Sequence, residues 1–280
     1  MKRFLFIAAV ACACLAAART HAGTLAQFHI AGLGDMLIEL YDTDKPVTAG
    51  NFVRYVQSDA YRDMFAHRWV PQFVIQGGGF YVADRTTTNA TVKAVTAFPA
   101  ITNEYSVGRT FSNSYGSIAM ARQGGATNSA TSQWFINLAN NAFLDTVDGG
   151  FTVFGQLRVG TNVLNRFNLT TAANGIFRWD AGGVLNELPA FTSTNLTTDD
   201  VVYVAVTLPA QPRLEVRVNA NTTRELSWNS LSNLVNHLEF TTNPSAGWQI
   251  LLSTNSPGGI LHYTDTAAPG ASRLYRVRIE

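Results

Sequence analysis

Apolar and polar residues alternate in short runs along most of the chain, a pattern typical of β-strands. Residues 28–30 and 37–40 form two such runs, joined by the turn signal Gly32-Leu33-Gly34-Asp35. Strands are therefore expected on both sides of this turn. Further strands, each bounded by Gly, Asn or Asp, are expected at residues 73–75, 117–121, 133–138 and 151–154, with a closing strand at 201–206.

Two segments follow a helical period instead. Apolar residues recur at i+3, i+4 and i+7 from Ala49, which predicts a helix with one apolar stripe facing a core. Pro46 suits the first turn of this helix, and Thr43 or Asp44 is expected to cap it. A second, shorter helix is expected at residues 161–167.

The pattern changes after Pro209-Ala210-Gln211-Pro212, which we interpret as a linker of residues 209–212. Residues 213–280 contain short alternating runs separated by Pro and Gly turn signals, which predicts a small β-sandwich-like module. Trp228 and Trp248 are expected in its core, with stacking on sugar rings as the alternative. We expect this module to serve attachment or protein interaction.

The N-terminus, residues 1–22, has the composition of a secretory signal peptide, with Lys2-Arg3 before an apolar core and a small-residue stretch. Cleavage is expected after Ala18 or, preferably, Ala22, because a strand-like run follows. A membrane anchor is less favoured because the apolar stretch is shorter than the roughly 20 residues that a span needs. A lipoprotein acylated at Cys12 is a further alternative. The mature protein is expected to be exported, either periplasmic or secreted.

Removal of the signal changes the composition of the protein. Both cysteines lie within it, so the mature chain, residues 23–280, would have no disulfide and no thiolate site. The 20 basic residues fall to 17 against 19 acidic ones, a net charge of about −2. No basic run is present, so nucleic acid is not an expected partner. The histidines lack metal-ligand spacing, and no other stretch is long enough to cross a bilayer, so neither a metal nor a membrane span is expected.

Candidate chemistry is concentrated in residues 67–79, which contain a cation, side-chain amides and several apolar groups. If the segment were a single strand, Phe73 and Gln76 would face opposite sides, because side chains alternate. A bend at Pro71 or at the following glycines would be needed to bring Arg68, Phe73 and Gln76 together. Taken alone, the segment also fits a surface arginine beside a strand edge.

Other motifs resolve this ambiguity. Ile118-Ala119-Met120-Ala121-Arg122, residues 131–137, Phe143-Leu144-Asp145 and residues 151–155 follow in order. With Asn51-Phe52 and residues 67–78, they resemble the cyclophilin family over nearly all of residues 24–208, and Asn103-Glu104-Tyr105 and Asn186-Glu187-Leu188-Pro189 resemble its bacterial members. The resemblance implies a mainly β domain of residues 23–208: an eight-stranded closed barrel capped by two helices, with the active site on its outer face.

The resemblance also implies a function, peptidyl-prolyl cis/trans isomerisation of proline-containing polypeptides. No bond is broken in this reaction, so no cofactor is expected, and the protein is expected to be a monomer. By position, Arg68 and Gln76 match catalytic residues, with Gln76 orienting Arg68. A catalytically weak protein that only binds proline-containing segments is the alternative. The residues matching the substrate groove are Phe73, Val74, Ala121, Arg122, Gln133, Phe135, Phe143, Leu144 and Phe151.

Several positions depart from the best-known family pattern. Val74 stands where methionine is common, Phe143 where many members have tryptophan, and Phe151 where they have histidine. Phenylalanine lacks the indole N–H donor, so weak cyclosporin binding is expected. Arg122 replaces a common asparagine, which preserves a backbone role and leaves the role of its side chain open. Trp69 and Trp134 are expected in the core, and the stretches 80–100 and 168–185 are longer than a minimal member needs.

Overall fold

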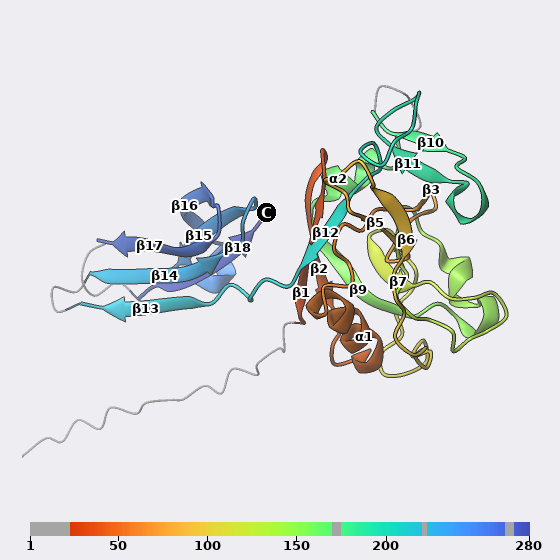
Figure 1. The fold of residues 1–280 in the computed structure, drawn as a ribbon. Coiled ribbons are helices and arrows are strands. Elements are labelled where there is room, and N and C mark those ends of the chain that lie inside the picture. Colours follow the sequence, from red (N-terminus) through yellow and green to blue (C-terminus); the bar gives the residue numbers. More distant parts are fainter. Residues whose placement is uncertain (1–22, 170–174, 220–222, 267–271) are drawn as a thin grey trace, which may run out of the picture.

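The computed structural model describes residues 23–169, 175–219, 223–266 and 272–280, so the expected signal peptide lies outside the described residues. The part before residue 209 is mainly β, with two α-helices among its described residues, α1 (Pro46–Gln57) and α2 (Thr161–Arg166) (Figure 1). Its strands are β1 (Leu25–Ile30), β2 (Gly34–Leu40), β3 (Arg68–Val70), β4 (Val74–Gly77), β5 (Phe80–Ala83), β6 (Thr91–Ala94), β7 (Ser117–Met120), β8 (Trp134–Asn137), β9 (Val153–Val159), β10 (Phe177–Trp179), β11 (Leu188–Ala190) and β12 (Val204–Thr207).

Eight of these strands form one curled antiparallel sheet in the order β12-β1-β2-β9-β7-β8-β4-β3, with α1 and α2 at opposite ends of it (Figure 1). The expected closed barrel is wrong, because edge strands β12 and β3 do not pair with each other along their length. The residues that precede these two strands are linked by an isolated bridge between Phe65 and Tyr203. The reason lies in β3, which has three residues and whose Trp69 N–H donates to the carbonyl of Glu187 at 2.7 Å instead.

The interior of the curled sheet is filled by aromatic and aliphatic side chains. Phe28 packs edge-on against Trp134 at 5.2 Å and stacks on Phe52 of α1 at 5.9 Å. Trp69 is also buried, and its indole N–H donates to the carbonyl of Phe167. The core positions predicted for Trp69 and Trp134 are therefore confirmed. Since side chains fill the interior, a site for a polypeptide has to lie outside it.

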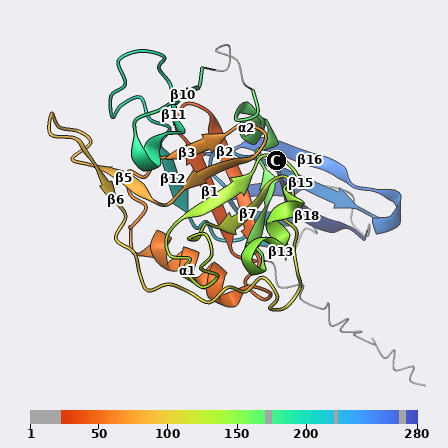
Figure 2. The ribbon, with the colours of Figure 1, turned by 90° about the vertical axis from the view of Figure 1, so that its right-hand side faces the viewer.

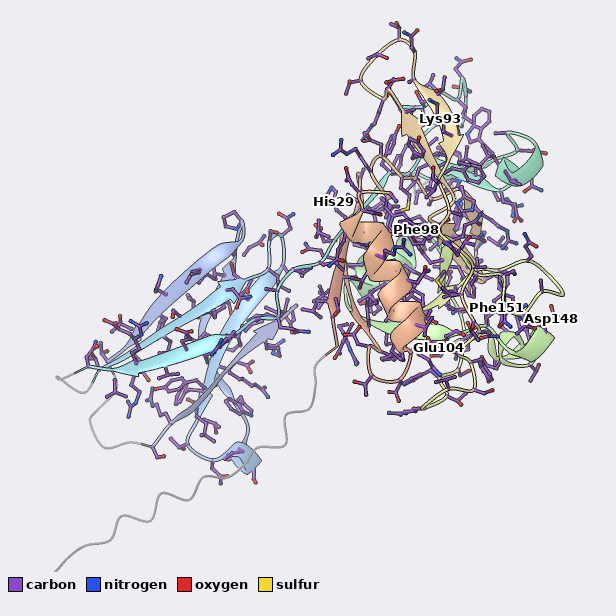
Figure 3. The ribbon with its side chains drawn as sticks, turned by 60° about the horizontal axis from the view of Figure 1, so that its bottom comes forward. His29, Lys93, Phe98, Glu104, Asp148 and Phe151 are labelled. Atoms are coloured by element: carbon purple, nitrogen blue, oxygen red, sulfur yellow. The ribbon has the colours of Figure 1, made fainter. Side chains whose placement is uncertain are left out.

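Helix α1 begins at Pro46, as predicted, but neither Thr43 nor Asp44 caps it. The carboxylate of Glu104 does so from a distant loop, accepting hydrogen bonds from the Val47 and Thr48 N–H groups at 3.1 and 2.7 Å (Figure 3). A carboxylate here satisfies two free N–H donors and faces the positive end of the helix dipole. Local capping rules could not identify this residue, because it is supplied through tertiary packing.

The segment 67–79 is not one strand but includes a β-hairpin. Strands β3 and β4 pair in the register Arg68–Gln76 and Val70–Val74. Pro71 begins the turn, and Gln72 adopts a left-handed φ of 61° within it. The bend expected at Pro71 is therefore confirmed, whereas the single strand was wrong. Because the chain reverses here, Arg68 and Gln76 lie directly opposite each other on neighbouring strands.

The longer stretch after β4 forms a second hairpin. Strands β5 and β6 pair with each other, Tyr81 of β5 also bridges Met64, and all four residues of β6 are exposed. Figure 2 shows the hairpin extending away from the curled sheet. The other longer stretch contains β10, the 3₁₀ helix η4 (Gly183–Leu185) and β11, with residues 170–174 outside the described residues.

Beyond residue 212 the chain forms two three-stranded sheets, β13-β14-β17 and β16-β15-β18. Their facing sides share a cluster centred on Leu226, Trp228 and Leu238, so Trp228 is a core residue. Trp248 is partly covered by Arg276, whose guanidinium lies 4.3 Å from its ring. The strands are β13 (Leu214–Val218), β14 (Arg224–Ser230), β15 (Val235–Thr241), β16 (Gln249–Asn255), β17 (Gly259–Asp265) and β18 (Leu274–Ile279).

This C-terminal module contacts the curled sheet at β1 and β2 (Figure 1). Leu231 and Leu234 of the module share a buried cluster with Leu25 and Leu37. The side-chain amide of Gln27 donates to the carbonyl of Ser232 at 2.9 Å. The module therefore covers apolar surface of the curled sheet and does not lie free at the end of its linker.

Within the described ranges, no helix is both long and apolar enough to cross a bilayer. The same residues contain no group of three or more His, Cys, Asp or Glu side chains placed to hold a metal ion.

Candidate functional site

Arg68, Gln76 and Gln133 lie side by side on the outer surface of the curled sheet. Arg68 faces Gln76 across the β3–β4 hairpin, and the Gln76 side-chain amide donates to Oε1 of Gln133 at 2.8 Å. The side chain of Arg68 is 35% exposed, and its guanidinium lies 5.7 Å from the ring of Phe73. A half-exposed cation is thus placed beside two amides that can bind the backbone of a polypeptide. The predicted contact between Gln76 and Arg68 is not among the hydrogen bonds of the described residues.

An apolar cluster adjoins these polar groups. Its members come from β4, β7, β8, η1 (Ala142–Asp145) and the residues beside β9, which the sheet topology brings together. Phe135 packs edge-on against Phe151 at 5.8 Å. Phe73 and Phe151 remain partly exposed, so the cluster has an accessible side. The structure brings together six of the predicted groove residues in this cluster: Phe73, Val74, Ala121, Phe135, Leu144 and Phe151.

Phe143 lies at the rim of this cluster and is 56% exposed. Its ring stacks on Phe73 at a centroid distance of 5.7 Å, with an interplanar angle of 22°. An exposed aromatic ring beside the cluster extends the apolar surface without enclosing it. Phe143 therefore lies beside the cluster and not within it; its role in binding stays a prediction.

A buried amide network supports the cluster from beneath. The side chain of Asn141 donates to the carbonyl of Phe73 and to the side-chain oxygen of Asn137, both at 2.8 Å. Asn137 donates in turn to the hydroxyl of Ser117 at 2.9 Å. Because buried polar groups need partners, this network fixes the backbone of Phe73 and the start of η1. These asparagines were not predicted from the sequence, although Asn137 ends an otherwise apolar strand, which is a detectable signal.

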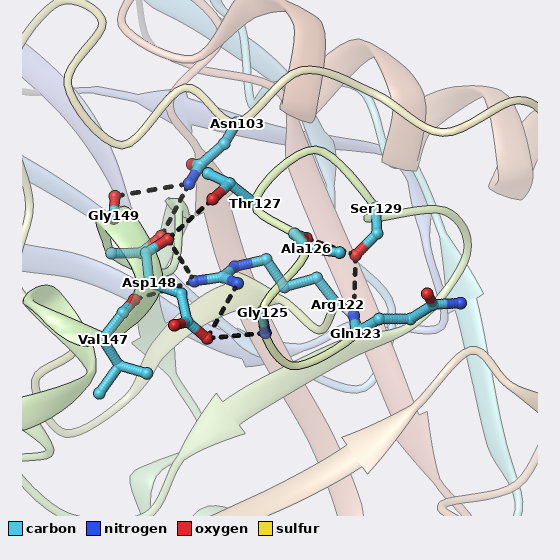
Figure 4. A network of polar contacts seen from close by, with 11 residues as sticks. Asn103, Arg122, Gln123, Gly125, Ala126, Thr127, Ser129, Val147, Asp148 and Gly149 are labelled. Carbon is cyan, nitrogen blue, oxygen red and sulfur yellow. Dashed lines mark hydrogen bonds and ion pairs between the residues drawn. The ribbon is translucent and has the colours of Figure 1, made fainter.

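Arg122 is placed differently from the other predicted groove residues. Its side chain is 3% exposed and turns away from Arg68 towards η2 (Val147–Gly149). One Nη group donates to the carbonyls of Val147 and Asp148 at 2.9 and 3.0 Å, as Figure 4 shows. The guanidinium also lies 4.2 Å from the ring of Phe151. The role left open for this side chain is therefore a structural one: it joins two loops that border the apolar cluster.

The loop that follows Arg122 is joined to the same turn by further polar contacts (Figure 4). Thr127 donates to the carbonyl of Asp148, and the Gly125 N–H donates to its carboxylate, at 3.1 and 3.0 Å. The backbone next to Arg122 also pairs with the neighbouring segment, because Ala121 N–H donates to the carbonyl of Gln133 at 2.9 Å. These contacts hold the polar wall of the groove in one arrangement.

Two shallow depressions lie on either side of the Gln76–Gln133 pair. One, of about 240 Å³, is bordered by Ala121, Arg122 and Thr131. The other, of about 280 Å³, is bordered by His67, Arg68 and the residues Val184 and Asn186 of the longer stretch. Both include Gln76 and Gln133 in their lining. The polar groups thus separate two open recesses, a geometry suited to an extended chain rather than to an enclosed small molecule.

His67 lies directly behind this surface and is 3% exposed. The pKa of its imidazole is lowered to about 4, mainly by burial; a hydrogen bond with Gln133 raises the pKa, and the charge of the neighbouring Arg68 lowers it. The ring is therefore neutral at physiological pH.

Glu187 was not recognised as a site residue from the sequence, although it belongs to one of the quoted motifs. Its Oε2 accepts a hydrogen bond from Nε of Arg68 at 2.7 Å. Its other oxygen lies 3.8 Å from the guanidinium of Arg178. The two partners Arg68 and Glu187 are 119 residues apart in the chain, so no local pattern could have revealed the pair.

Comparisons with known proteins identify the family of the chain. The family model described as "Cyclophilin type peptidyl-prolyl cis-trans isomerase/CLD" matches residues 25–178, more than half of the chain. A peptidyl-prolyl cis-trans isomerase of Acinetobacter baylyi is 43% identical over 147 residues, which cover 51% of this chain and 72% of that protein. Peptidyl-prolyl cis-trans isomerase A of Dickeya dadantii is 38% identical over 143 residues, covering 50% and 70%.

A solved structure, a cyclophilin type isomerase of Cryptosporidium parvum in the presence of the dipeptide Ala-Pro, is 19% identical. It aligns with a TM-score of 0.46 over 67% of this chain and 99% of its own. The extent of the family match and the identity to the bacterial proteins confirm the predicted family, whose named activity is peptidyl-prolyl cis/trans isomerisation. The chain therefore belongs to the cyclophilin-type peptidyl-prolyl cis-trans isomerase family.

Proposed function

We propose that the protein accelerates rotation about Xaa-Pro peptide bonds of exported polypeptides, with Arg68 as its catalytic residue. The observation that carries this proposal is the position of Arg68 and Gln76, opposite each other on one hairpin and beside an apolar cluster of suitable composition. Phe73, Phe135 and Leu144 of this cluster would hold the proline ring. Gln76, Gln133 and the backbone around Arg122 would bind the main chain on either side of it.

The chemistry follows from the peptide bond itself. Rotation about it is opposed by about 18–20 kcal/mol, because conjugation gives the C–N bond partial double-bond character. Twisting removes the conjugation and makes the prolyl nitrogen a hydrogen-bond acceptor. A guanidinium that donates to this nitrogen stabilises the twisted state more than the planar one, and only such a difference accelerates rotation. No bond is broken, so neither a nucleophile nor a proton shuttle is required.

The direct test is an isomerisation assay on a short Xaa-Pro peptide, followed by NMR exchange, with the mature protein and its Arg68→Ala variant. We expect the wild type to accelerate exchange clearly and the variant to lose most of this acceleration. A wild-type rate equal to the uncatalysed rate, combined with peptide binding, would instead support the alternative of a protein that only binds proline-containing segments.

Export and the role of the C-terminal module are part of the same proposal. The N-terminal composition supports a cleaved signal, and mass spectrometry of the protein made in a bacterial host should show a mature chain beginning at Gly23. A chain that retains residues 1–22 would contradict export by cleavage, and acylated Cys12 would indicate the lipoprotein alternative. We propose that residues 213–280 serve attachment or protein interaction. Deleting them exposes Leu25 and Leu37, so stability must be measured together with location and partners.

A further inference from the structure

The ion pair between Arg68 and Glu187 joins β3 to the segment that precedes β11. Glu187 lies between η4 and β11, directly after the stretch 168–185. Among the described residues, it is the carboxylate that pairs with Arg68. This ion pair constrains the guanidinium of Arg68, the proposed catalytic group.

The backbone at Glu187 is held firmly in place. Its carbonyl accepts the Trp69 N–H at 2.7 Å, on the strand that carries Arg68. The next residue, Leu188, is buried in a cluster with Phe65 and Tyr203 and pairs with Trp179 of β10. Because the main chain at Glu187 is fixed beside β3, the carboxylate of Glu187 is held close to the side chain of Arg68.

The hydrogen bond restricts the guanidinium without using the donors that face a substrate. Arginine has five N–H donors, of which Nε provides one and the two Nη groups provide four. Glu187 accepts from Nε, so the Nη donors remain for the peptide. A free arginine side chain has about 2 kcal/mol of rotamer entropy, and anchoring Nε to a fixed carboxylate reduces the loss on binding. Against this, a nearby anion weakens the positive potential that the guanidinium offers.

We propose that Glu187 is a positioning residue, which orients the guanidinium of Arg68 through Nε so that the Nη donors point at the prolyl amide. This inference rests on the proposed catalytic role of Arg68. It assigns a part in catalysis to the short segment between η4 and β11, which carries Glu187 and follows the longer stretch 168–185. The orientation outweighs the loss of positive potential, because catalysis by hydrogen-bond donors depends on their being aimed before the reaction begins.

Two variants of Glu187 separate orientation from charge. Glu187→Gln keeps an oxygen that accepts from Nε but removes the negative charge, whereas Glu187→Ala removes both. We expect Glu187→Ala to lower kcat roughly tenfold with KM changed less than about twofold, and Glu187→Gln to stay within about threefold of the wild-type kcat. In ¹⁵N NMR spectra, the Nε–H signal of Arg68 should shift and exchange faster with water in Glu187→Ala only.

A matched control is available on the far side of the sheet. Glu39 of β2 accepts from Nε of Arg158 at 2.8 Å, the same kind of pair between residues of two sheet strands. Glu39→Ala should leave kcat unchanged, because exposed ion pairs away from the site contribute little. If Glu187→Ala lowers the unfolding midpoint by more than Glu39→Ala does, the kinetic test uses Glu187→Asp in its place. The aspartate carboxylate is one methylene too short to reach Nε of Arg68.

The outcomes distinguish this inference from the proposed function. An inactive Arg68→Ala variant together with wild-type kcat in Glu187→Ala would overturn the positioning role and leave the proposed function intact. A Glu187→Gln variant as impaired as Glu187→Ala would overturn it as well, because charge and not alignment would then be decisive. Full activity in Arg68→Ala would contradict the catalytic site itself.

Discussion

Two arginines border the same groove and are used in opposite ways. The Arg68 side chain is 35% exposed and donates from Nε to Glu187, and no hydrogen bond of its Nη groups is found among the described residues. The Arg122 side chain is 3% exposed; one Nη group donates to the carbonyls of Val147 and Asp148, and its other donor nitrogens are buried. Both were matched to the groove by position in the sequence, but only Arg68 has donors available for a substrate.

The difference shows that the neighbours of a guanidinium decide its use. Arg68 is anchored at its inner nitrogen by a carboxylate, which leaves the outer donors unused. Arg122 is anchored at an outer nitrogen by carbonyls and lies over the ring of Phe151 at 4.2 Å. An arginine whose Nη groups bind the protein stabilises the fold, whereas one held through Nε keeps its Nη donors for a substrate.

The largest effect is expected from exchanging arginine for lysine at each position. Arg68→Lys keeps the charge but loses the rigid fork of donors, so kcat/KM should fall about 100-fold. Arg122→Lys should lower it less than about fivefold, because the backbone of the groove is kept. Isomerisation rates for both variants, measured with the same peptide, give the comparison. Similar losses in the two variants would remove the distinction between them.

A second effect tests the buried layer behind Arg68. The pKa of His67 is lowered to about 4 from 6.5, so the unfolded chain takes up a proton in a range where the folded one does not. The contribution of His67 is therefore complete above pH 6.5 and is lost progressively as the pH falls towards 4. The full loss amounts to about 3 kcal/mol, from a shift of 2.5 pKa units.

Urea unfolding of the wild type and of His67→Gln at several pH values between 7.5 and 4 would measure this contribution. Other acid-sensitive groups are common to both proteins, so the difference between the two curves isolates His67. The free energy of unfolding of the wild type should decrease more steeply with acid. Parallel curves would show that the imidazole is not held neutral by its surroundings.

Truncation to alanine should reverse the ranking of the two arginines. Arg122→Ala removes hydrogen bonds from a charged donor and a contact with an aromatic ring, so the free energy of unfolding should fall by about 2 kcal/mol. Arg68→Ala breaks a half-exposed ion pair and should cost less than about 1 kcal/mol. Urea denaturation at pH 7 measures both. An equal cost for the two variants would mean that the buried contacts of Arg122 contribute no more than an exposed pair.

The smallest effect is expected at the rim. Phe143→Ala removes the stacking of Phe143 on Phe73, and such aromatic pairs contribute about 0.5–1.5 kcal/mol. Because Phe143 is 56% exposed, the loss of stability should lie at the lower end of this range. We expect a KM increase of a few-fold with nearly unchanged kcat, since this ring adds apolar surface but does not act on the amide. A kcat loss as large as that of Arg68→Lys would place Phe143 in the catalytic step instead.

The fold could be predicted from the sequence wherever local pattern determines it. Helix α1 begins at Pro46, the two expected helices are present, and a bend at Pro71 follows from the fixed geometry of proline. The closed barrel failed because closure depends on pairing between distant edges. The Trp69 N–H is instead paired with Glu187, a competitor that no local pattern indicates.

The ordered motifs were sufficient to predict the family, and they named six residues that the structure brings together in the apolar cluster. How Arg68 and Arg122 are used depends on their surroundings in the folded chain. The partners that make this difference, Glu187 and the turn at Val147 and Asp148, lie 119 and about 25 residues away along the chain. Hydrogen bonds and ion pairs act over a few ångströms in space, so contacts between such distant residues exist only once the chain has folded.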